Sequence, residues 1–151
     1  GKSRLVNRGL KEGLAAYYVS ENYGYDKKWG FRDAKGNIVV PAKYKEVDDF
    51  SNGLAAVATV SGADNVMKWG FIDKTGKVVV PLEYDYVDEF REGLAFVEKK
   101  GKYSFVDMTG KVVIPVEYAV VDGFIEGLAK VKKNGKWGFI DKTGNVVISH
   151  E

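Results

Sequence analysis

The sequence predicts an all-β fold built from a tandem repeat of three-stranded meanders. The first observation is repetition, since the segment KWGFIDKTG at residues 68–76 returns letter for letter at 136–144. Edited copies begin at Lys27, as KKWGFRDAKG, and at Gly101, as GKYSFVDMTG. The second observation is that short apolar runs bounded by Gly, Asp and Pro flank each copy, which is typical of strands. Self-similarity of this kind is the signature of a repeat architecture.

Four repeats follow one another in register within one domain. The opening glycine precedes the central aromatic residue by 16 residues in repeats 1 and 2 and by 10 in repeats 3 and 4. The first two repeats therefore carry six extra residues at the same place. We place the repeats at residues 13–52, 53–92, 93–126 and 127–151. Residues 1–12 resemble the end of a preceding repeat, with an N-terminal cap as the alternative.

Each repeat is expected to hold three strands. The first is a small and apolar run such as 93–97, the second is the Lys-Trp-Gly-Phe-Ile-Asp stretch, and the third is a valine run such as 78–80. Consecutive valines indicate burial on both faces of the third strand. An Asp-Lys-Thr-Gly turn joins the second strand to the third. There Gly76 supplies a left-handed backbone, and the Asp73 carboxylate accepts a hydrogen bond from an amide two residues on.

The connector after each third strand carries three apolar residues spaced by three, for example Tyr84, Val87 and Phe90. This spacing predicts a short helical turn with one apolar side. The glycine of the following Glu-Gly-Leu motif is expected to end that turn in a left-handed cap. A single meander leaves both faces of its sheet exposed to water, so the repeats must stack to bury their aromatic residues. Three strands per repeat favour an open, solenoid-like or superhelical array, with a closed β-propeller-like array as the alternative.

Composition excludes several classes of function. The 23 Lys and Arg residues are interspersed with 21 Asp and Glu, so the one-sided basic surface of a nucleic-acid binder is missing. No apolar run reaches the ~18 residues of a membrane span. Cysteine is absent and His150 is the only histidine, which leaves no thiol catalysis and no multi-histidine metal site. The sequence therefore predicts no catalytic residue, no metal and no cofactor.

Carboxylates recur at Asp33, Asp73, Asp107 and Asp141, where the chemistry of the turn requires them in every repeat. The acidic connector at 83–89 lacks the spacing of a calcium loop. An Asp/Glu pair can hydrolyse a glycoside without histidine, but each carboxylate here belongs to a turn or a connector. An enzyme is therefore the least favoured hypothesis.

The repeated segments resemble the WG-repeat (KWG) family, tandem β-repeat proteins found mostly in bacteria. The resemblance rests on KWGFIDKTGKVVVP followed by EYDYVDEFREGLA, and it extends from Glu12 to Ile148. Repeat 3 departs from the pattern with Tyr103-Ser104 in place of Trp-Gly, and repeat 4 has Ser149 in place of proline. The resemblance implies a β-rich module with an interaction role and brings no catalytic motif. We favour a cell-envelope or secreted location over the cytoplasm.

The inserted residues of repeats 1 and 2 are the favoured binding site. Both insertions lengthen the same hairpin loop, and in repeat folds such insertions gather on one face, often the binding face. Tyr, Ser, Gly and Asn suit recognition, although a tolerated surface loop is the other interpretation. We therefore predict a non-enzymatic interaction or scaffold module that binds a protein partner through hairpin-tip residues Asn22, Tyr23, Tyr25, Asp26, Asp64, Asn65 and Met67.

The Trp-Gly pairs offer an alternative site. Indole faces bind sugars and cations, and a neighbouring glycine clears room for a ligand. The same glycine also lets a side chain of a neighbouring repeat lie across the strand. Trp69 shares a strand face with Phe71, which is typical of core packing. If the indoles are exposed, the alternative function is binding of a carbohydrate or cell-wall polymer through Trp29, Trp69 and Trp137.

Overall fold

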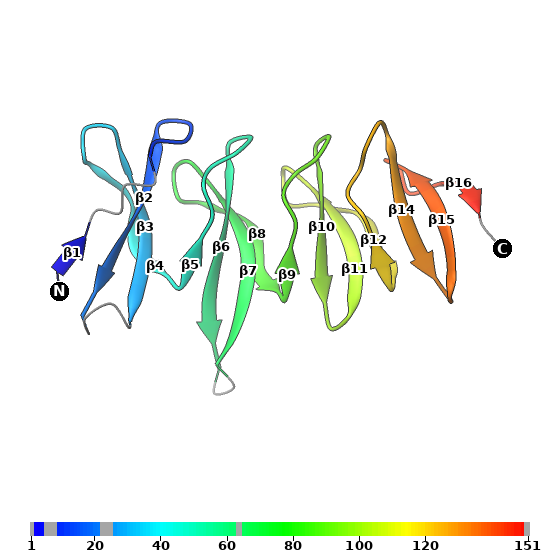
Figure 1. The fold of residues 1–151 in the computed structure, drawn as a ribbon, viewed down its shortest axis with the longest axis horizontal. Helices are drawn as coiled ribbons and strands as arrows, with labels where there is room; N and C mark the ends of the chain where they lie inside the picture. Colours follow the sequence, from blue (N-terminus) through cyan, green and yellow to red (C-terminus); the bar gives the residue numbers. More distant parts are fainter. Residues whose placement is uncertain (1, 5–8, 22–25, 63–64, 150–151) are drawn as a thin grey trace. The chain divides into compact units, whose positions relative to one another are not determined.

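A computed structural model describes residues 2–4, 9–21, 26–62 and 65–149, and all regular structure in these residues is β (Figure 1). The chain divides into two compact units, Gly1–Leu82 and Glu83–Glu151. The described strands form four four-stranded sheets, and none of these sheets closes on itself. The all-β tandem repeat is thereby confirmed, while the open form of the array stays a prediction. No helix in the described part of the chain is long and apolar enough to span a membrane.

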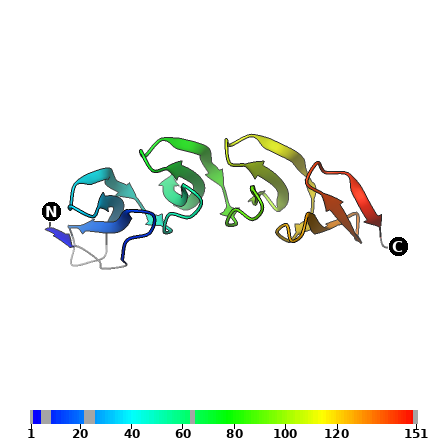
Figure 2. The ribbon, with the colours of Figure 1, turned by 90° about the horizontal axis from the view of Figure 1, so that it is seen from above.

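In the first unit, the order of strands in each sheet follows the chain (Figures 1 and 2). The first sheet contains β1 (Lys2–Arg4), β2 (Leu14–Ser20), β3 (Lys27–Asp33) and β4 (Ile38–Tyr44). The second contains β5 (Glu46–Val47), β6 (Leu54–Ser61), β7 (Val66–Asp73) and β8 (Val78–Tyr84). Each sheet is thus the expected three-stranded meander with one short strand added at its edge.

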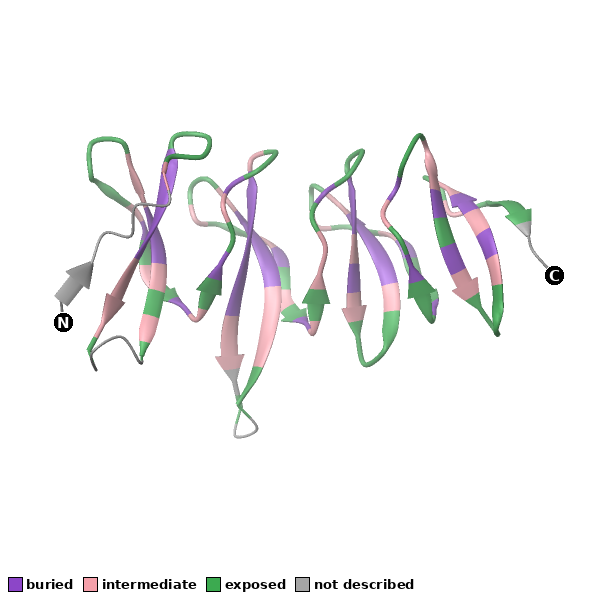
Figure 3. Ribbon diagram, viewed as in Figure 1, coloured by how far each residue is buried: buried purple, intermediate pink, exposed green. Residues whose placement is uncertain are grey.

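The second unit repeats this plan. One sheet contains β9 (Tyr86–Val87), β10 (Leu94–Lys99), β11 (Lys102–Asp107) and β12 (Val112–Tyr118). The other contains β13 (Val120–Val121), β14 (Leu128–Lys133), β15 (Lys136–Asp141) and β16 (Val146–Ser149). In both units the buried residues concentrate along the strands, and the turns are mostly exposed (Figure 3).

The connectors are short strands, so the predicted helical turns are wrong. In the first connector, Val47 of β5 lies opposite Val57 of β6. The amides of Lys45 and Asp48 donate to carbonyls of β6, 2.8 and 2.9 Å away, which keeps the connector extended. Because the connector's amides find acceptors on the next repeat, they do not need acceptors within a helical turn.

The glycine after each connector belongs to a hairpin turn and not to a helix cap, which corrects the second expectation for this segment. Asn52 and Gly53 have φ of 56° and 78°, and the backbones of Ser51 and Leu54 exchange two hydrogen bonds around them. Two successive positive φ values define a type I′ turn. The same turn occurs at Glu12-Gly13, Glu92-Gly93 and Glu126-Gly127.

The glycine of the Trp-Gly pair is required by a crossing of two backbones within one repeat. Trp29 pairs with Tyr44 of β4, and Phe31 pairs with Val40, so a step of two residues on β3 matches a step of four on β4. This register shift is a β-bulge. A Cβ on Gly30 would overlap with the Val40 carbonyl oxygen and lie 2.8 Å from the Pro41 carbonyl carbon. The glycine therefore clears room for the third strand of its own repeat, and the expected side chain from a neighbouring repeat is not what it accommodates.

Gly70 stands in the same position in repeat 2, where an added Cβ would overlap with the Val80 carbonyl oxygen. Repeat 3 has Ser104 there, with only 1% of its surface exposed, and its strands β11 and β12 keep the same register shift. A serine side chain is thus compatible with this register shift in repeat 3.

The third strand is fully buried on one face only, contrary to the expectation from its consecutive valines. Val80 is fully buried, whereas Val79 and Pro81, which face the opposite side, are half-buried and exposed. Val78 shares the face of Val80 but stands at the start of the strand, and it is 45% exposed. Ile38, Val112 and Val146 at the equivalent positions are also exposed.

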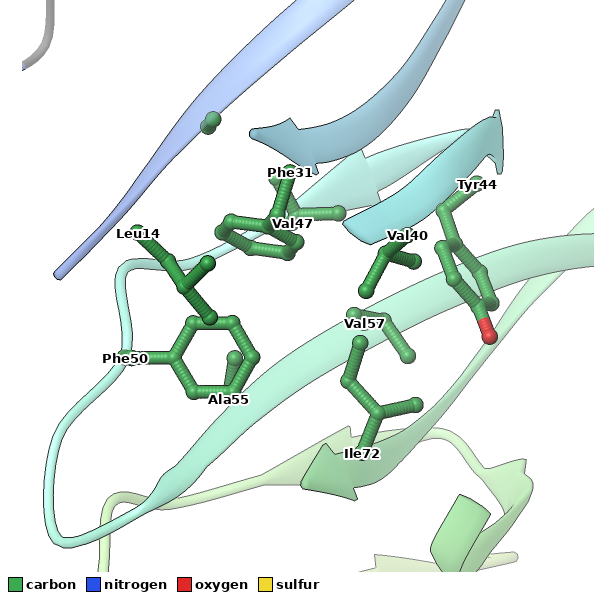
Figure 4. Close-up of a cluster of buried hydrophobic side chains, with 10 residues drawn as sticks. Leu14, Phe31, Val40, Tyr44, Val47, Phe50, Ala55, Val57 and Ile72 are labelled. Atoms are coloured by element: carbon green, nitrogen blue, oxygen red, sulfur yellow. The ribbon is translucent and has the colours of Figure 1, made fainter. Parts of the chain in front are cut away.

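Each unit has one core between its two sheets, and the two cores use the same positions of the repeat. Edge-to-face ring pairs mark the centre of each, with centroids 4.6 Å apart for Phe31–Phe50 and 4.8 Å for Phe105–Phe124. In the first unit the buried residues are Leu14, Phe31, Val40, Tyr44, Val47, Phe50, Ala55, Val57 and Ile72 (Figure 4). Their counterparts in the second are Leu94, Phe105, Ile114, Tyr118, Val121, Phe124, Ala129, Val131 and Ile140. The expected stacking of repeats is therefore confirmed within each unit.

We expect Gly70→Ala to destabilise the protein, because the new methyl group must displace the backbone of β8. Overpacking of this kind costs about 1–3 kcal/mol of unfolding free energy. Urea denaturation followed by circular dichroism measures the loss. Ser104→Ala is the matched control, since repeat 3 already holds a Cβ at this position, and it should cost less. An unchanged urea midpoint for Gly70→Ala would contradict the crossing.

Candidate functional site

The two inserted loops join corresponding strands of the first unit. The β2–β3 pairing ends at Ser20 opposite Lys27, and the β6–β7 pairing ends at Ser61 opposite Val66. Because β2 and β6 both start from a type I′ turn and run the same way, the strand ends at which the insertions begin lie at the same end of this unit (Figure 1). The insertions themselves lie partly outside the described residues, so their gathering on one face stays a prediction.

The loop residues predicted as the binding site are described only in part. Asn22, Tyr23, Tyr25 and Asp64 lie outside the described residues. Asp26 and Asn65 are exposed, and Met67 is half-buried opposite Val60. Asn65 has φ of 58°, a left-handed conformation that asparagine tolerates better than most residues. Asn65 thus has a role in the turn in addition to its exposure.

The same connections in the second unit are two-residue turns. Lys100 and Gly101 have φ of 52° and 79°, and Asn134 and Gly135 have φ of 51° and 76°. These are again type I′ turns, which close a hairpin with only two loop residues. The repeat can therefore be completed without an insertion.

The three tryptophans are half-buried, neither enclosed in the core nor fully exposed. Trp29 packs partly against the core of the first unit, and its ring centroid is 5.2 Å from that of Tyr18. Trp69 lies across the strand pair from the buried Ala58. Each indole thus offers part of its surface. Beside Trp29 and Trp69 the adjacent glycine does not enlarge it, because the third strand fills that space.

Trp137 has a different environment, which sequence reasoning missed. The ammonium groups of Lys130 and Lys132 lie 4.7 and 5.5 Å from the centroid of its ring. Both lysines are on β14, next to Trp137 on β15. An alignment of the repeats reveals the unusual lysine, because Lys130 stands where repeats 1 and 2 have Ala16 and Ala56.

The recurring aspartates are turn residues, as predicted. The Asp73 carboxylate accepts hydrogen bonds from the Thr75 amide and hydroxyl, at 2.9 and 2.6 Å, and Gly76 has φ of 91°. The Thr75 hydroxyl, followed by nearby backbone amides, holds the pKa of Asp73 below its ordinary value of 3.8. Asp107 and Asp141 receive the same hydroxyl bond from Thr109 and Thr143. Carboxylates stabilised in the charged form are poor general acids at neutral pH.

Acidic side chains of the connector at 83–89 also have hydrogen-bond or ion-pair partners within the protein. Asp85 accepts the Lys100 amide at 2.9 Å, and Arg91 lies 3.3 Å from Asp88 and 2.8 Å from Glu89. In the part of the chain that the structure describes, no three or more His, Asp or Glu side chains are grouped to hold a metal ion.

Comparison with known proteins gives one family. The model of the WG containing repeat matches residues 29–58, 69–103, 103–137 and 137–151. These matches cover more than half of the chain and begin at Trp29, Trp69, Tyr103 and Trp137. No curated protein matches the chain.

We expect Thr75→Ala to raise the pKa of Asp73 towards 3.8, because the strongest donor to its carboxylate is removed. A carboxyl whose folded pKa is depressed contributes stability above its unfolded pKa and loses it as the pH falls through the folded pKa. The free energy of unfolding of the variant should therefore fall less than that of wild type as the pH is lowered below about 4. NMR titration of the Asp73 carboxyl measures the shift. Asp33, whose turn has Lys35 in place of threonine, is the internal control, and an unshifted Asp73 would contradict the assignment.

Proposed function

The chain belongs to the WG-repeat family, and we propose that it is a non-enzymatic interaction module that binds a protein partner through the inserted loops of its first unit. The observation that carries the proposal is that the flanking strand ends of both insertions lie at one end of this unit, in the connection that the second unit closes with two residues. A loop pair on a rigid sheet frame is the usual arrangement of a binding surface.

The insertions are not needed for the fold. The pairing of Val19 with Lys28 and of Thr59 with Lys68 corresponds to that of Lys99 with Lys102, where the second unit makes its turn. Extra loop residues add to the entropy lost on closing the hairpin. The described residues of the insertions do not belong to the buried cluster of the first unit. Asp26 and Asn65, at the rim of the insertions, are exposed to solvent.

Carbohydrate binding through Trp29, Trp69 and Trp137 is the second candidate. The partial exposure of all three indoles favours it. It has less support than the loops, because Trp29 packs against Tyr18 and the core, and two lysines lie over Trp137.

The experiment replaces each loop with the turn of repeat 4. In one variant Asn-Gly replaces residues 20–27, and in a second it replaces residues 60–67. We expect both variants, and their combination, to keep the wild-type circular dichroism spectrum, because the flanking pairs already match those of the second unit. Bound proteins are then captured from an extract of the source organism and quantified by mass spectrometry.

The proposal predicts a protein that wild type retains and the combined loop variant loses. Lys100→Asn, which makes an Asn-Gly turn in the second unit, is the matched control and should retain that protein. A partner held equally by wild type and the combined variant would refute the role of the loops. Retention that soluble glycans abolish would instead favour the carbohydrate candidate.

A further inference from the structure

The sequence contains two Asn-Gly pairs, and both form type I′ turns. Asn52-Gly53 closes the turn before β6, and Asn134-Gly135 closes the turn between β14 and β15. Both asparagines are exposed. An asparagine followed by glycine can lose ammonia without an enzyme, since glycine has no Cβ to keep its amide nitrogen away from the asparagine side chain. The same reaction can therefore be compared in two surroundings.

The reaction is a ring closure between the two neighbouring residues. The glycine amide nitrogen loses its proton to the solvent and attacks Cγ of the asparagine side chain. A bond from this nitrogen to Cγ forms, the bond from Cγ to Nδ2 breaks, and ammonia leaves with a proton from water. Water then opens the resulting succinimide to aspartate or isoaspartate. Water is the only co-reactant, so the surroundings of the glycine amide control the reaction.

The amide of Gly53 is held by a carboxylate. It donates to Glu12 Oε1 at 2.9 Å. This bond is the largest cause that keeps the pKa of Glu12 below its ordinary value of 4.5, so the acceptor is charged at neutral pH. Loss of the amide proton would break the bond and leave a negative nitrogen beside a negative oxygen, which is unfavourable. Glu12 therefore protects Asn52 from ring closure.

The amide of Gly135 lacks such an acceptor. Within the part of the chain that the structure describes, this amide makes no hydrogen bond. At the same place in repeat 3, the amide of Gly101 donates to Glu98 Oε1 at 3.1 Å. Repeat 4 has Lys132 in the position of Glu98. One difference between the two repeats thus removes the protecting carboxylate.

The Asn134-Gly135 turn is also surrounded by positive charge. Lys133 and Lys136 lie opposite each other at the base of the turn, and both are exposed. Nearby cations stabilise a nitrogen that has lost its proton. In repeat 3, Lys100 and Gly101 are exposed although another repeat follows them. The exposure of this turn is therefore a property of the hairpin end itself.

We propose that Asn134 is a site of spontaneous deamidation in the folded protein and that Asn52 is protected. The product has a carboxylate in a turn that two lysines flank, which lowers the positive charge of this hairpin end. Isoaspartate also lengthens the main chain of a two-residue turn by one atom, so it disrupts the pairing of Lys133 with Lys136. The site lies in the second unit, and its modification does not depend on the partner proposed for the loops of the first.

The test follows both asparagines in the folded chain during incubation in a mildly alkaline buffer. Digestion in acid and mass spectrometry detect the mass gained when an amide becomes a carboxylic acid. We expect Asn134 to react about tenfold faster than Asn52, because only the Gly53 amide must give up a hydrogen bond to a charged group. In urea, where the fold is lost, the two rates should be similar.

Lys100→Asn is the matched variant, because it creates an Asn-Gly pair in the same turn of repeat 3. The introduced asparagine should react more slowly than Asn134, and adding Glu98→Ala should remove that difference. In repeat 4, Lys132→Glu should slow the reaction of Asn134. An Asn134 that reacts no faster than Asn52 in the folded chain, or no faster than the asparagine introduced by Lys100→Asn, would overturn the proposal.

Discussion

The close approach of two backbones at the Trp-Gly pair is the constraint on which the rest of the repeat depends. At Gly30 and Gly70, the third strand passes where a Cβ would otherwise be. The bulge that results pairs Trp29 with Tyr44 and Phe31 with Val40 in one sheet. Phe31, Val40 and Tyr44 thereby face one core, and the chain leaves the sheet in the direction of the next repeat. The bulge, which repeat 3 keeps with Ser104 in place of glycine, thus sets the geometry of the inter-repeat packing.

The remaining local features serve this packing. Type I′ turns return the connector onto the first strand of the next repeat, which brings Val47 and Phe50 against Phe31. At the same end of the sheets, Glu12 accepts the Gly53 amide at 2.9 Å, and Glu92 accepts the Gly127 amide at 2.8 Å. These bonds link the turns of successive repeats within each unit. Apolar burial supplies the attraction between repeats, and the turn contacts fix their register.

Local chemistry made part of the fold predictable from the sequence. The Asp73–Gly76 turn follows from side-chain bonding and left-handed φ, and both depend on neighbouring residues alone. The connector was misjudged because a spacing of three places Tyr44, Val47 and Phe50 on one side whether the chain is helical or bent between short strands. Only the acceptors on β6, which belong to another repeat, decide between them. The exposure of Val78 likewise depends on how the repeats pack, since Val80 on the same face of the strand is buried. The loop positions were predictable from repeat length, whereas the lysines over Trp137 depend on which residues of β14 and β15 lie side by side.

Recognition in such a chain is confined to the positions that the frame leaves free. Loop length is one of them, because a two-residue turn closes the same hairpin in the second unit. The side chain at position 130 is another, since repeat 4 has a lysine where repeats 1 and 2 have alanine. The ammonium group of Lys130 lies 4.7 Å from the centroid of the Trp137 ring, and any group that covers it must compensate its charge.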